Sequence, residues 1–303
     1  MTHPELAPLL VVVGPTASGK SELALRLAEE RAGEIIGADS VQVYRRFDIG
    51  SSKPTLEERA RVPHHLVDFA DPLEPLDAGA WAVRAASAVE EVRSRGRTPI
   101  VCGGTFLWVK ALVYGLATGP GRDEALRERH RLFVEERGRP ALHAELARVD
   151  ATSAARLAPN DFVRVSRALE VFELTGVPLS RYQAEHGFSA PRYRAELVGV
   201  RRSPAELDER IARRAKEMLA GGFIEEVRGL LADGFGAARA ISSVGYRQVA
   251  QAVSAETPID LHALADEVRR ATRVFARRQR TWLRDQPVTW LEPGASLPAT
   301  RAP

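Results

Sequence analysis

An aliphatic run that leads straight into a glycine-bounded turn and then into a helix constrains this chain more than any other feature. The run is Leu9–Val13, and residues 14–21 after it fit the pattern Gly-x4-Gly-Lys-Ser. From residue 22 onward, leucine and alanine recur at helical spacing. A strand, a glycine-rich loop and a helix in this order are the context in which the pattern binds phosphate, so an ordinary strand-to-helix turn is the weaker interpretation.

The residue types of this loop suit an anion for separate physical reasons. Successive backbone N–H groups at a helix N-terminus point at a phosphate, and the helix dipole favours negative charge there. Lys20 adds a positive charge, and the Ser21 hydroxyl can hold Mg²⁺. The sequence therefore predicts a diphosphate- or nucleotide-binding loop made of Gly14, Pro15, Thr16, Ala17, Ser18, Gly19, Lys20 and Ser21.

Composition indicates a soluble globular protein. Of the 303 residues, 45% are hydrophobic and 27% are charged, and the net charge of +3 does not by itself argue for a nucleic-acid partner. No apolar run reaches membrane-spanning length, so we expect a cytoplasmic protein with no membrane partner. The single cysteine, Cys102, excludes an intramolecular disulfide and a multi-cysteine metal site, and its place after an apolar run predicts a buried, unreactive thiol.

Strand and helix patterns alternate over residues 1–114 and return over residues 192–303. This alternation predicts an α/β fold, a P-loop NTPase-like parallel sheet flanked by helices, as the catalytic core. Residues 115–191 between the two stretches show helical periodicity without a strand pattern, so we expect an all-helical insertion domain there. The individual helices are predicted over residues 124–136, 141–149 and 161–175.

Two polar residues directly follow predicted strands. Asp39 comes after the strand expected at residues 34–38, and Thr105 comes after the strand expected at residues 98–102 and two glycines. Ligands of open α/β sheets lie beyond the carboxyl ends of the strands, so both side chains can face the phosphate loop. A turn aspartate and a helix-capping threonine are the structural alternatives.

Two helical faces carry arginines that a nucleic acid could use. Arg164 and Arg167 are three residues apart on one face. The last helix, predicted over residues 264–284, carries arginines along one side, with Phe275 and Trp282 opposite them at core spacing. A solvated face is the simpler interpretation of such arginines, and contact with RNA phosphates is the more specific one.

A P-loop usually indicates an NTPase or a nucleotide kinase, and two observations count against that function. NTPases usually carry a magnesium-holding aspartate at the end of a later buried strand, whereas the strand at residues 98–102 ends in Gly-Gly-Thr. Small kinases usually add a short lid rather than several inserted helices. The carboxylate of Asp39, close behind the loop, instead suits a base beside a bound pyrophosphate.

Eight segments of the chain closely resemble the bacterial tRNA dimethylallyltransferases. They are residues 14–21, 39–44, 48–54, 63–68, 103–105, 160–170, 244–248 and 277–284, and the resemblance runs from about residue 9 to residue 290. The P-loop alone is shared with many kinases, but the ensemble is specific. Departures are small: Ser21 stands where many members have threonine, and Val41 stands where methionine is common.

The resemblance implies a prenyltransferase enzyme. Such an enzyme transfers a dimethylallyl group from dimethylallyl diphosphate to the exocyclic N6 of the adenosine 3′-adjacent to the anticodon, in tRNAs that read U-initial codons. It forms N6-(dimethylallyl)adenosine and releases diphosphate. The resemblance also implies Mg²⁺ as the cofactor, with Ser21 as its protein ligand, and an insertion domain that grips the anticodon stem-loop of the tRNA. We expect the enzyme to act as a monomer.

The resemblance also implies roles for individual residues. Asp39 accepts the proton of the amine, and Thr105 bonds the target base. Arg214 stabilises the leaving diphosphate together with backbone donors of residues 16–20, although Arg210 and Arg213 remain alternatives to Arg214. The residues that match RNA contacts of the family are Asp39, Ser40, Val41, Gln42, Thr105, Arg127, Val163, Arg164, Val165, Ser166, Arg167, Gly245, Tyr246 and Arg247.

Three other functions remain open from the sequence. A P-loop small-molecule or nucleotide kinase would use ATP at the same loop. A non-catalytic RNA-binding module would use the loop only to dock the backbone. Adenylate isopentenyltransferases act on free nucleotides and share the loop and the aspartate. The inserted helices argue against the kinase, and segments 160–170 and 242–248 argue against the enzymes that act on free nucleotides.

Overall fold

The computed structural model describes residues 6–117, 119–255 and 257–297 of the chain. The chain forms two compact units, one from the residues up to Val113 together with those from Pro191 onward, and one from Tyr114–Ala190. The backbone N–H of Arg192 donates to the carbonyl of Val113 at 2.6 Å. The chain therefore leaves and re-enters the first unit at a hydrogen-bonded pair of residues.

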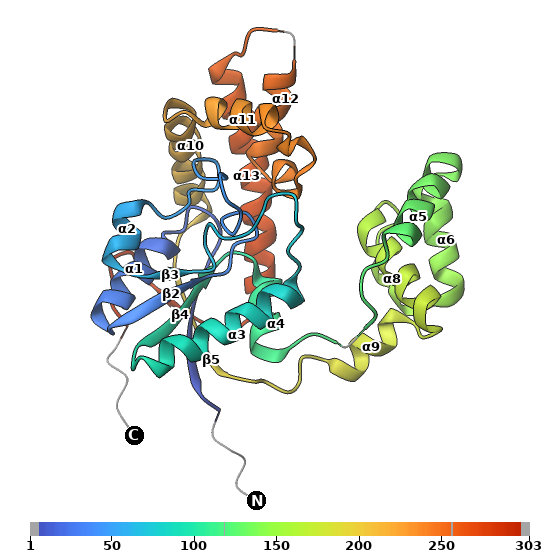
Figure 1. Cartoon of the computed structure of the whole chain (residues 1–303), viewed down its shortest axis with the longest axis horizontal. Helices are drawn as coiled ribbons and strands as arrows, with labels where there is room; N and C mark the ends of the chain where they lie inside the picture. The colour runs from blue at the N-terminus through green and yellow to red at the C-terminus, as the bar shows by residue number, and fades with distance from the viewer. Residues whose placement is uncertain (1–5, 118, 256, 298–303) are drawn as a thin grey trace, which may run out of the picture. The chain divides into compact units, whose positions relative to one another are not determined.

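The first unit is built on a parallel sheet (Figure 1). Among the described residues the sheet has six strands in the spatial order β3-β2-β4-β1-β5-β6, and all neighbouring strands run parallel. The α/β fold expected from the sequence is confirmed. The strands are β1 (Pro8–Val13), β2 (Gly33–Gly37), β3 (His64–His65), β4 (Thr98–Gly103), β5 (Arg194–Val200) and β6 (Val288–Leu291).

The strand order brings three polar segments to one edge of the sheet. Strand β4 lies between β1 and β2. Because these strands are parallel, their carboxyl ends meet at the same edge. The phosphate loop follows β1, Asp39 follows β2, and Thr105 follows β4. The topology alone therefore brings the three candidate site elements together.

Helices surround this sheet (Figure 1). The α-helices of the unit are α1 (Lys20–Glu30), α2 (Leu56–Arg61), α3 (Ala78–Ser94), α4 (Phe106–Tyr114), α10 (Pro204–Ala220), α11 (Phe223–Ala232), α12 (Tyr246–Ser254) and α13 (Leu261–Leu283). Two 3₁₀ helices, η1 (Phe235–Ala237) and η2 (Arg239–Ser242), connect α11 to α12.

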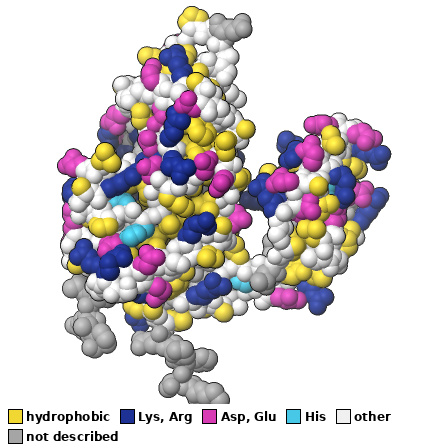
Figure 2. Space-filling view, in the orientation of Figure 1, with side chains coloured by type: hydrophobic (Ala, Val, Ile, Leu, Met, Phe, Trp, Pro, Cys, Tyr) yellow, Lys and Arg dark blue, Asp and Glu magenta, His cyan; other side chains and the backbone are white. Residues whose placement is uncertain are grey.

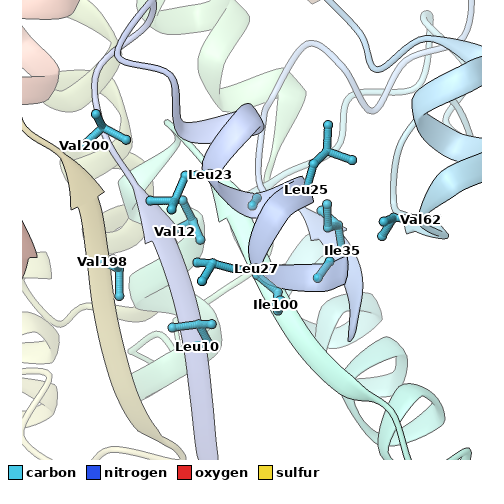
Figure 3. Close-up of a cluster of buried hydrophobic side chains, with 12 residues drawn as sticks. Leu10, Val12, Leu23, Leu25, Leu27, Ile35, Val62, Ile100, Val198 and Val200 are labelled. Atoms are coloured by element: carbon cyan, nitrogen blue, oxygen red, sulfur yellow. The ribbon is translucent and has the colours of Figure 1, made fainter. Parts of the chain in front are cut away.

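Strand β1 is covered on both faces. Leu10 and Val12 join α1 in a buried hydrophobic cluster (Figure 3). Val11 points to the opposite face by the alternation of a strand and is also fully buried. Helix α3 packs against β2 and β4, where Trp81 Nε1 donates to the carbonyl of Gly37 at 3.0 Å. The strand that leads into the phosphate loop is therefore buried on both of its faces.

The buried face of α13 differs from the one expected. Phe275 and Trp282 were expected in the core, but they are 39% and 47% exposed. The helix instead buries Ala276 and Leu283, each of which directly follows one of the two aromatic residues, and Val268 and Gln279 lie on the same buried stripe. The expectation was wrong because it selected the largest apolar side chains rather than the stripe that fits the neighbouring helices.

The second unit is all-helical within the residues that the structure describes. Its helices α5, α6 and α8 occupy the three ranges expected from the sequence to within two residues, while the short α7 and α9 were missed. Figure 2 shows basic and acidic side chains intermixed over the visible face of this unit. Its helices are α5 (Glu124–Arg137), α6 (Arg139–Val149), α7 (Ala151–Arg156), α8 (Phe162–Thr175) and α9 (Leu179–His186).

A buried carboxylate joins two of these helices. Glu170 on α8 is fully buried and accepts two hydrogen bonds from Arg127 on α5, both at 2.9 Å. It also accepts a bond from Arg167 at 2.6 Å and one from the backbone N–H of Asp123 at 2.8 Å. Burial alone would raise the pKa of Glu170, but these hydrogen bonds overcome it and lower the pKa to about 2.

We expect Glu170→Gln to destabilise the protein in a pH-dependent manner. A carboxyl whose pKa is lowered on folding stabilises above its unfolded value of 4.5 and loses that contribution as the pH falls toward 2. At neutral pH the variant should lose roughly 3 kcal/mol of unfolding free energy, as measured by urea denaturation. The loss should shrink below pH 4.5.

The matched control is Glu128→Gln, which removes an exposed carboxylate that pairs with Arg131 in the same unit. We expect it to cost less than about 1 kcal/mol. A Glu170→Gln variant as stable as the wild type at pH 7 would contradict the role given to the buried carboxylate.

Candidate active site

The phosphate loop leaves part of its backbone open to a ligand. Gly19, at φ 97°, precedes α1 in the left-handed conformation that favours glycine, and Ala17 is also left-handed at φ 63°. No hydrogen bond within the described ranges uses the backbone N–H of Ala17, Gly19, Lys20 or Ser21 as donor. These four N–H groups at the N-terminus of a helix form an anion-binding concavity.

Two other N–H groups of the loop are already bonded. Thr16 N–H donates to Gln279 Oε1 at 2.8 Å, and Ser18 N–H donates to the carbonyl of Pro15 at 3.2 Å. The set of backbone donors expected from residues 16–20 is therefore corrected, because each N–H has only one proton to donate. The four open groups described above replace that set.

The charged groups of the loop lie close together. Burial lowers the pKa of Lys20; Cys102 and Asp39 oppose this shift, and Arg214 adds to it. A bound anion would favour the charged ammonium. Loss of solvent around the thiol also raises the pKa of Cys102 to about 11, which makes it a poor nucleophile at neutral pH, as expected from the sequence. The residue is half-buried rather than buried, so that part of the expectation was wrong.

Asp39 stabilises the turn that follows it by hydrogen bonds, and its side chain also faces the candidate site. Its Oδ1 accepts the N–H of Val41 at 2.9 Å and that of Gln42 at 3.3 Å, so the turn role that the sequence left open is present. The same half-buried side chain lines a hollow together with Lys20 and Arg214. One carboxylate oxygen therefore fixes the orientation of the group, and the other remains for a substrate.

Thr105 bonds across the sheet edge to the segment that carries Asp39. Its Oγ1 accepts the N–H of Ser40 at 3.1 Å and lies 3.4 Å from the Ser40 hydroxyl. Its own N–H donates to the carbonyl of Ala38 at 3.2 Å. The helix-capping alternative is not what the structure shows, since the hydroxyl of Thr105 bonds Ser40 and, among the described residues, accepts no N–H of the following turn.

The sequence alone could not decide which of three arginines on α10 contacts the diphosphate, and the structure gives the three different surroundings. Arg213 is 62% exposed at its side chain and pairs with Glu217. Arg210 Nε donates to the carbonyl of Ala17 at 2.7 Å, which supports the loop. Arg214 lies 3.4 Å from Thr16 Oγ1, and burial lowers its pKa. Arg214 is therefore the arginine of the three best placed to meet an anion in the loop.

Two hollows meet at the phosphate loop. One, of about 860 Å³, extends from the loop toward the segment that contains Lys53 and Asp68. The other, of about 420 Å³, extends toward Asp39, Thr105 and the end of α13. The residues that line both are Ala17, Lys20, Ser21, Gln42, Ser52 and Arg214. An anion in the loop would be accessible from both sides.

The second hollow also contains most of the expected RNA contacts of this unit. Ser40, Val41 and Gln42 line it, and so do Gly245 and Arg247. These residues come from two segments far apart in the sequence. The structure therefore gathers them around the same space as the candidate catalytic side chains.

Tyr246 is the exception among these contacts. It is fully buried, and its hydroxyl donates to Glu226 Oε1 at 2.6 Å. Glu226 also accepts the successive N–H groups of Ile49 at 2.6 Å and Gly50 at 3.2 Å. The side chain of Tyr246 therefore anchors the wall of the hollow, and an RNA contact at residue 246 stays a prediction.

Of the RNA contacts expected on the helical unit, some have exposed side chains and others have buried ones. Val163 is 74% exposed, and the side chain of Arg164 is 65% exposed. The side chains of Val165 and Ser166 are buried in the core of the unit, and RNA contacts at these two positions stay predictions. A helical face alternates with a period of 3.6 residues, so five successive residues cannot all face solvent. Arg127 and Arg167 are held by the buried carboxylate described above.

Sequence reasoning missed the role of Gln279. Its segment was part of the resemblance, but no contact was assigned to the side chain. The available signal was a polar residue in the buried stripe of α13, because buried amides are nearly always hydrogen-bonded to a specific partner.

Neither a preformed metal cluster nor a membrane helix was found in the described part of the chain. No group of three or more His, Cys, Asp or Glu side chains there could hold a metal ion by itself. None of its helices is both long and apolar enough to cross a membrane.

Comparisons with known proteins agree over nearly the whole chain. A family model described as IPP transferase matches residues 42–286, and one described as isopentenyl transferase matches residues 7–68. The tRNA dimethylallyltransferase of Sorangium cellulosum is 57% identical over 95% of this chain and 91% of its own length. The tRNA dimethylallyltransferase 1 of Pelobacter propionicus is 47% identical over 96% and 94%.

Solved structures show the same fold. A tRNA isopentenylpyrophosphate transferase of Bacillus halodurans is 36% identical, with a TM-score of 0.67 over 94% of this chain and 89% of that one. A eukaryotic dimethylallyltransferase acting on tRNA is 24% identical, with a TM-score of 0.78 over 94% and 74%. The P-loop NTPase-like fold expected from the sequence is thereby confirmed.

We expect Gly103→Ala to destabilise the edge on which the site is built. A Cβ at this position would overlap with the carbonyl oxygen of Ala38, so β4 would have to move away from the end of β2. The variant should lose about 2 kcal/mol or more of unfolding free energy in urea denaturation. The matched control is Gly229→Ala on α11, where a Cβ meets nothing within 4 Å. Equal stability of the two variants would contradict the close approach.

Proposed function

The chain belongs to the IPP transferase family, and from this membership and the site geometry we propose that it transfers a dimethylallyl group from dimethylallyl diphosphate to a tRNA adenosine. It is a tRNA-modifying prenyltransferase. The acceptor is the exocyclic N6 of the adenosine 3′-adjacent to the anticodon, in tRNAs that read U-initial codons. The products are N6-(dimethylallyl)adenosine and diphosphate.

One observation carries the proposal beyond family membership. A base candidate, Asp39, and an anion-binding loop face the same hollow from the ends of β2 and β1, the two strands on either side of β4. Prenyl transfer needs this pair, because a C–N bond to the amine forms while the C–O bond to the diphosphate breaks. The hollows on the two sides of the loop support an acceptor that enters from one side and a donor that enters from the other.

The acceptor amine needs a base. The lone pair of an exocyclic adenine amine is delocalised into the ring, so the group is a weak nucleophile until its proton is removed. We assign this proton to the Asp39 carboxylate, an effect worth typically 10²–10⁴-fold in rate. Thr105, which bonds the neighbouring Ser40, would hold the adenine ring of the substrate against the Asp39 carboxylate.

The leaving group needs positive charge and N–H donors. As the allylic C–O bond breaks, negative charge accumulates on the diphosphate. The four open N–H groups of the loop, the Lys20 ammonium and the Arg214 guanidinium surround the space where this charge would develop. Fixed donors of this kind stabilise a transition state without reorganising.

The residues present fit Mg²⁺ carried by the diphosphate. Magnesium is typically bound by one or two protein groups and substrate phosphates rather than by a full protein cage. The Ser21 hydroxyl, in the first turn of α1 and on the lining of both hollows, would be that protein ligand. When bound, the ion would supply charge that neutralises the departing diphosphate.

The all-helical unit would grip the anticodon stem-loop. We propose residues 115–191 as the insertion domain and residues 1–114 with 192–303 as the catalytic core, acting as a monomer. On the helical unit, the exposed Val163 and Arg164 support an RNA-facing start of α8. Arg247 and Gly245 would bind RNA at the catalytic hollow.

The decisive experiment combines the purified protein with Mg²⁺, dimethylallyl diphosphate and an unmodified tRNA that carries the target adenosine. We expect formation of the prenylated nucleoside, detected by mass spectrometry of the digested tRNA. No product would refute the proposal. Phosphate transfer from ATP without tRNA would favour the kinase alternative, and efficient use of AMP as acceptor would favour an enzyme of free nucleotides.

We expect Asp39→Asn to lose turnover by about 10²–10⁴-fold while tRNA affinity is retained, because the amide keeps the turn-fixing oxygen but cannot accept the amine proton. Single-turnover rates and filter binding of tRNA separate the two quantities. The matched control is Asp71→Asn, another aspartate whose Oδ1 accepts a turn N–H. Equal loss of rate and of binding would contradict the role of Asp39 as a base.

We expect Ser21→Ala to raise the Mg²⁺ concentration needed for half-maximal rate. The change removes the one hydroxyl assigned to the ion and leaves the backbone N–H in place. Titration of the rate with Mg²⁺ measures the effect, and Ser94→Ala on α3, whose hydroxyl bonds only the carbonyl of Glu91 among the described residues, is the control. An unchanged Mg²⁺ requirement would exclude Ser21 as a ligand.

A further inference from the structure

One buried amide connects the two halves of the candidate site. Gln279, on α13, is 9% exposed. Its Oε1 accepts the N–H of Thr16 at 2.8 Å, and its Nε2 donates to the carbonyl of Gly104 at 3.0 Å. The two bonded residues are 88 positions apart in the sequence and lie at the ends of adjacent strands. A single planar group therefore bridges the phosphate loop and the turn after β4.

Each end of this bridge leads to a side chain proposed to act in the reaction. On the loop side, Thr16 Oγ1 lies 3.4 Å from Arg214, the guanidinium proposed to meet the departing diphosphate. On the other side, Gly104 precedes Thr105, which bonds the Ser40 N–H next to Asp39. The amide is thus linked through Thr16 to the residue proposed to stabilise the diphosphate. Through Gly104 it is linked to the residues proposed to act on the adenosine.

The glycine at position 104 gives the amide its access to the turn after β4. A Cβ at this position would overlap with Gln279 Nε2, so the amide could not keep its observed position beside the carbonyl. A planar amide offers an acceptor and a donor at a fixed separation, which a hydroxyl or an ammonium does not. Glutamine at 279 and glycine at 104 form a matched pair.

We propose that Gln279 is a positioning residue that sets the separation between the phosphate loop and the Asp39–Thr105 segment. The inference rests on the proposed prenyl transfer. Neither bond of the amide touches a reacting atom, so the residue acts through Thr16 and Gly104. In-line attack tolerates little error in this separation, since a misplacement of about 1 Å can cost about 100-fold in rate.

The first test replaces the amide by a side chain of similar length that cannot hydrogen-bond. We expect Gln279→Met to lower the single-turnover rate constant by about 100-fold, with little change in the binding of inorganic pyrophosphate or of unmodified tRNA. Gln251→Met, at an exposed position of α12, is the matched control and should keep wild-type rates. Thermal unfolding of both variants reports whether folding is intact.

The second test restores the bond pattern by protonation. In Gln279→Glu, the ionised carboxylate accepts from Thr16 but repels the carbonyl of Gly104. The neutral carboxyl has one donor and one acceptor, as the amide has. The rate of this variant relative to the wild type should therefore rise as the pH is lowered. The charged groups that line the same hollow (Lys20, Asp39, Arg214, Arg247 and Arg278) are common to both proteins and cancel in this ratio.

The outcomes separate the inference from the proposed function. Absence of prenylated tRNA with the wild type would refute the proposed function itself. With an active wild type, an unchanged rate in Gln279→Met would overturn the inference. So would a loss that lies entirely in pyrophosphate or tRNA affinity, or a Gln279→Glu ratio that is independent of pH. A rate loss at saturation, together with a ratio that rises in acid, would establish the positioning role.

Discussion

A loop that binds phosphate through its backbone must leave those N–H groups without partners inside the protein, so the rest of the fold has to hold it by other atoms. Here the loop is held by its backbone carbonyls. Arg210 donates to the carbonyl of Ala17, and Arg202 donates to the carbonyl of Ser18. Gln279 accepts the N–H of Thr16 at the start of the turn, and the N–H of Ser18 bonds the carbonyl of Pro15 within the loop. The helices after β5 are therefore a frame for the loop as much as a cover for the sheet.

This frame has an electrostatic consequence. It brings Lys20, Arg210 and Arg214 around a small space, and burial lowers the pKa of all three, with neighbouring arginines adding to the shift. Asp39 opposes the shift for both Lys20 and Arg214, and Glu217 also opposes it for Arg214. A bound diphosphate would relieve this repulsion, so the charge that suits the proposed leaving group is also charge that the folded protein holds at a cost.

The sequence was sufficient to predict those site residues that directly follow a strand of the parallel sheet. The Gly-x4-Gly-Lys-Ser loop and Asp39 at a strand end could be predicted because parallel topology sends such residues to one edge. It failed where packing decides which face is buried. Phe275 and Trp282 were assigned to the core and lie exposed. The bridge made by Gln279 joins residues distant in the chain, which local pattern cannot reveal.

The hydrogen bond between Arg192 and Val113 has a consequence for how such a chain can change over evolutionary time. It joins the two points at which the helical unit is spliced into the sheet-bearing unit. Closing a loop costs chain entropy that grows only slowly with its length. A splice whose ends already meet can therefore receive a longer, shorter or wholly different segment with little penalty to the sheet. The inserted helical unit and the sheet-bearing unit of such a protein can therefore change in length and sequence independently.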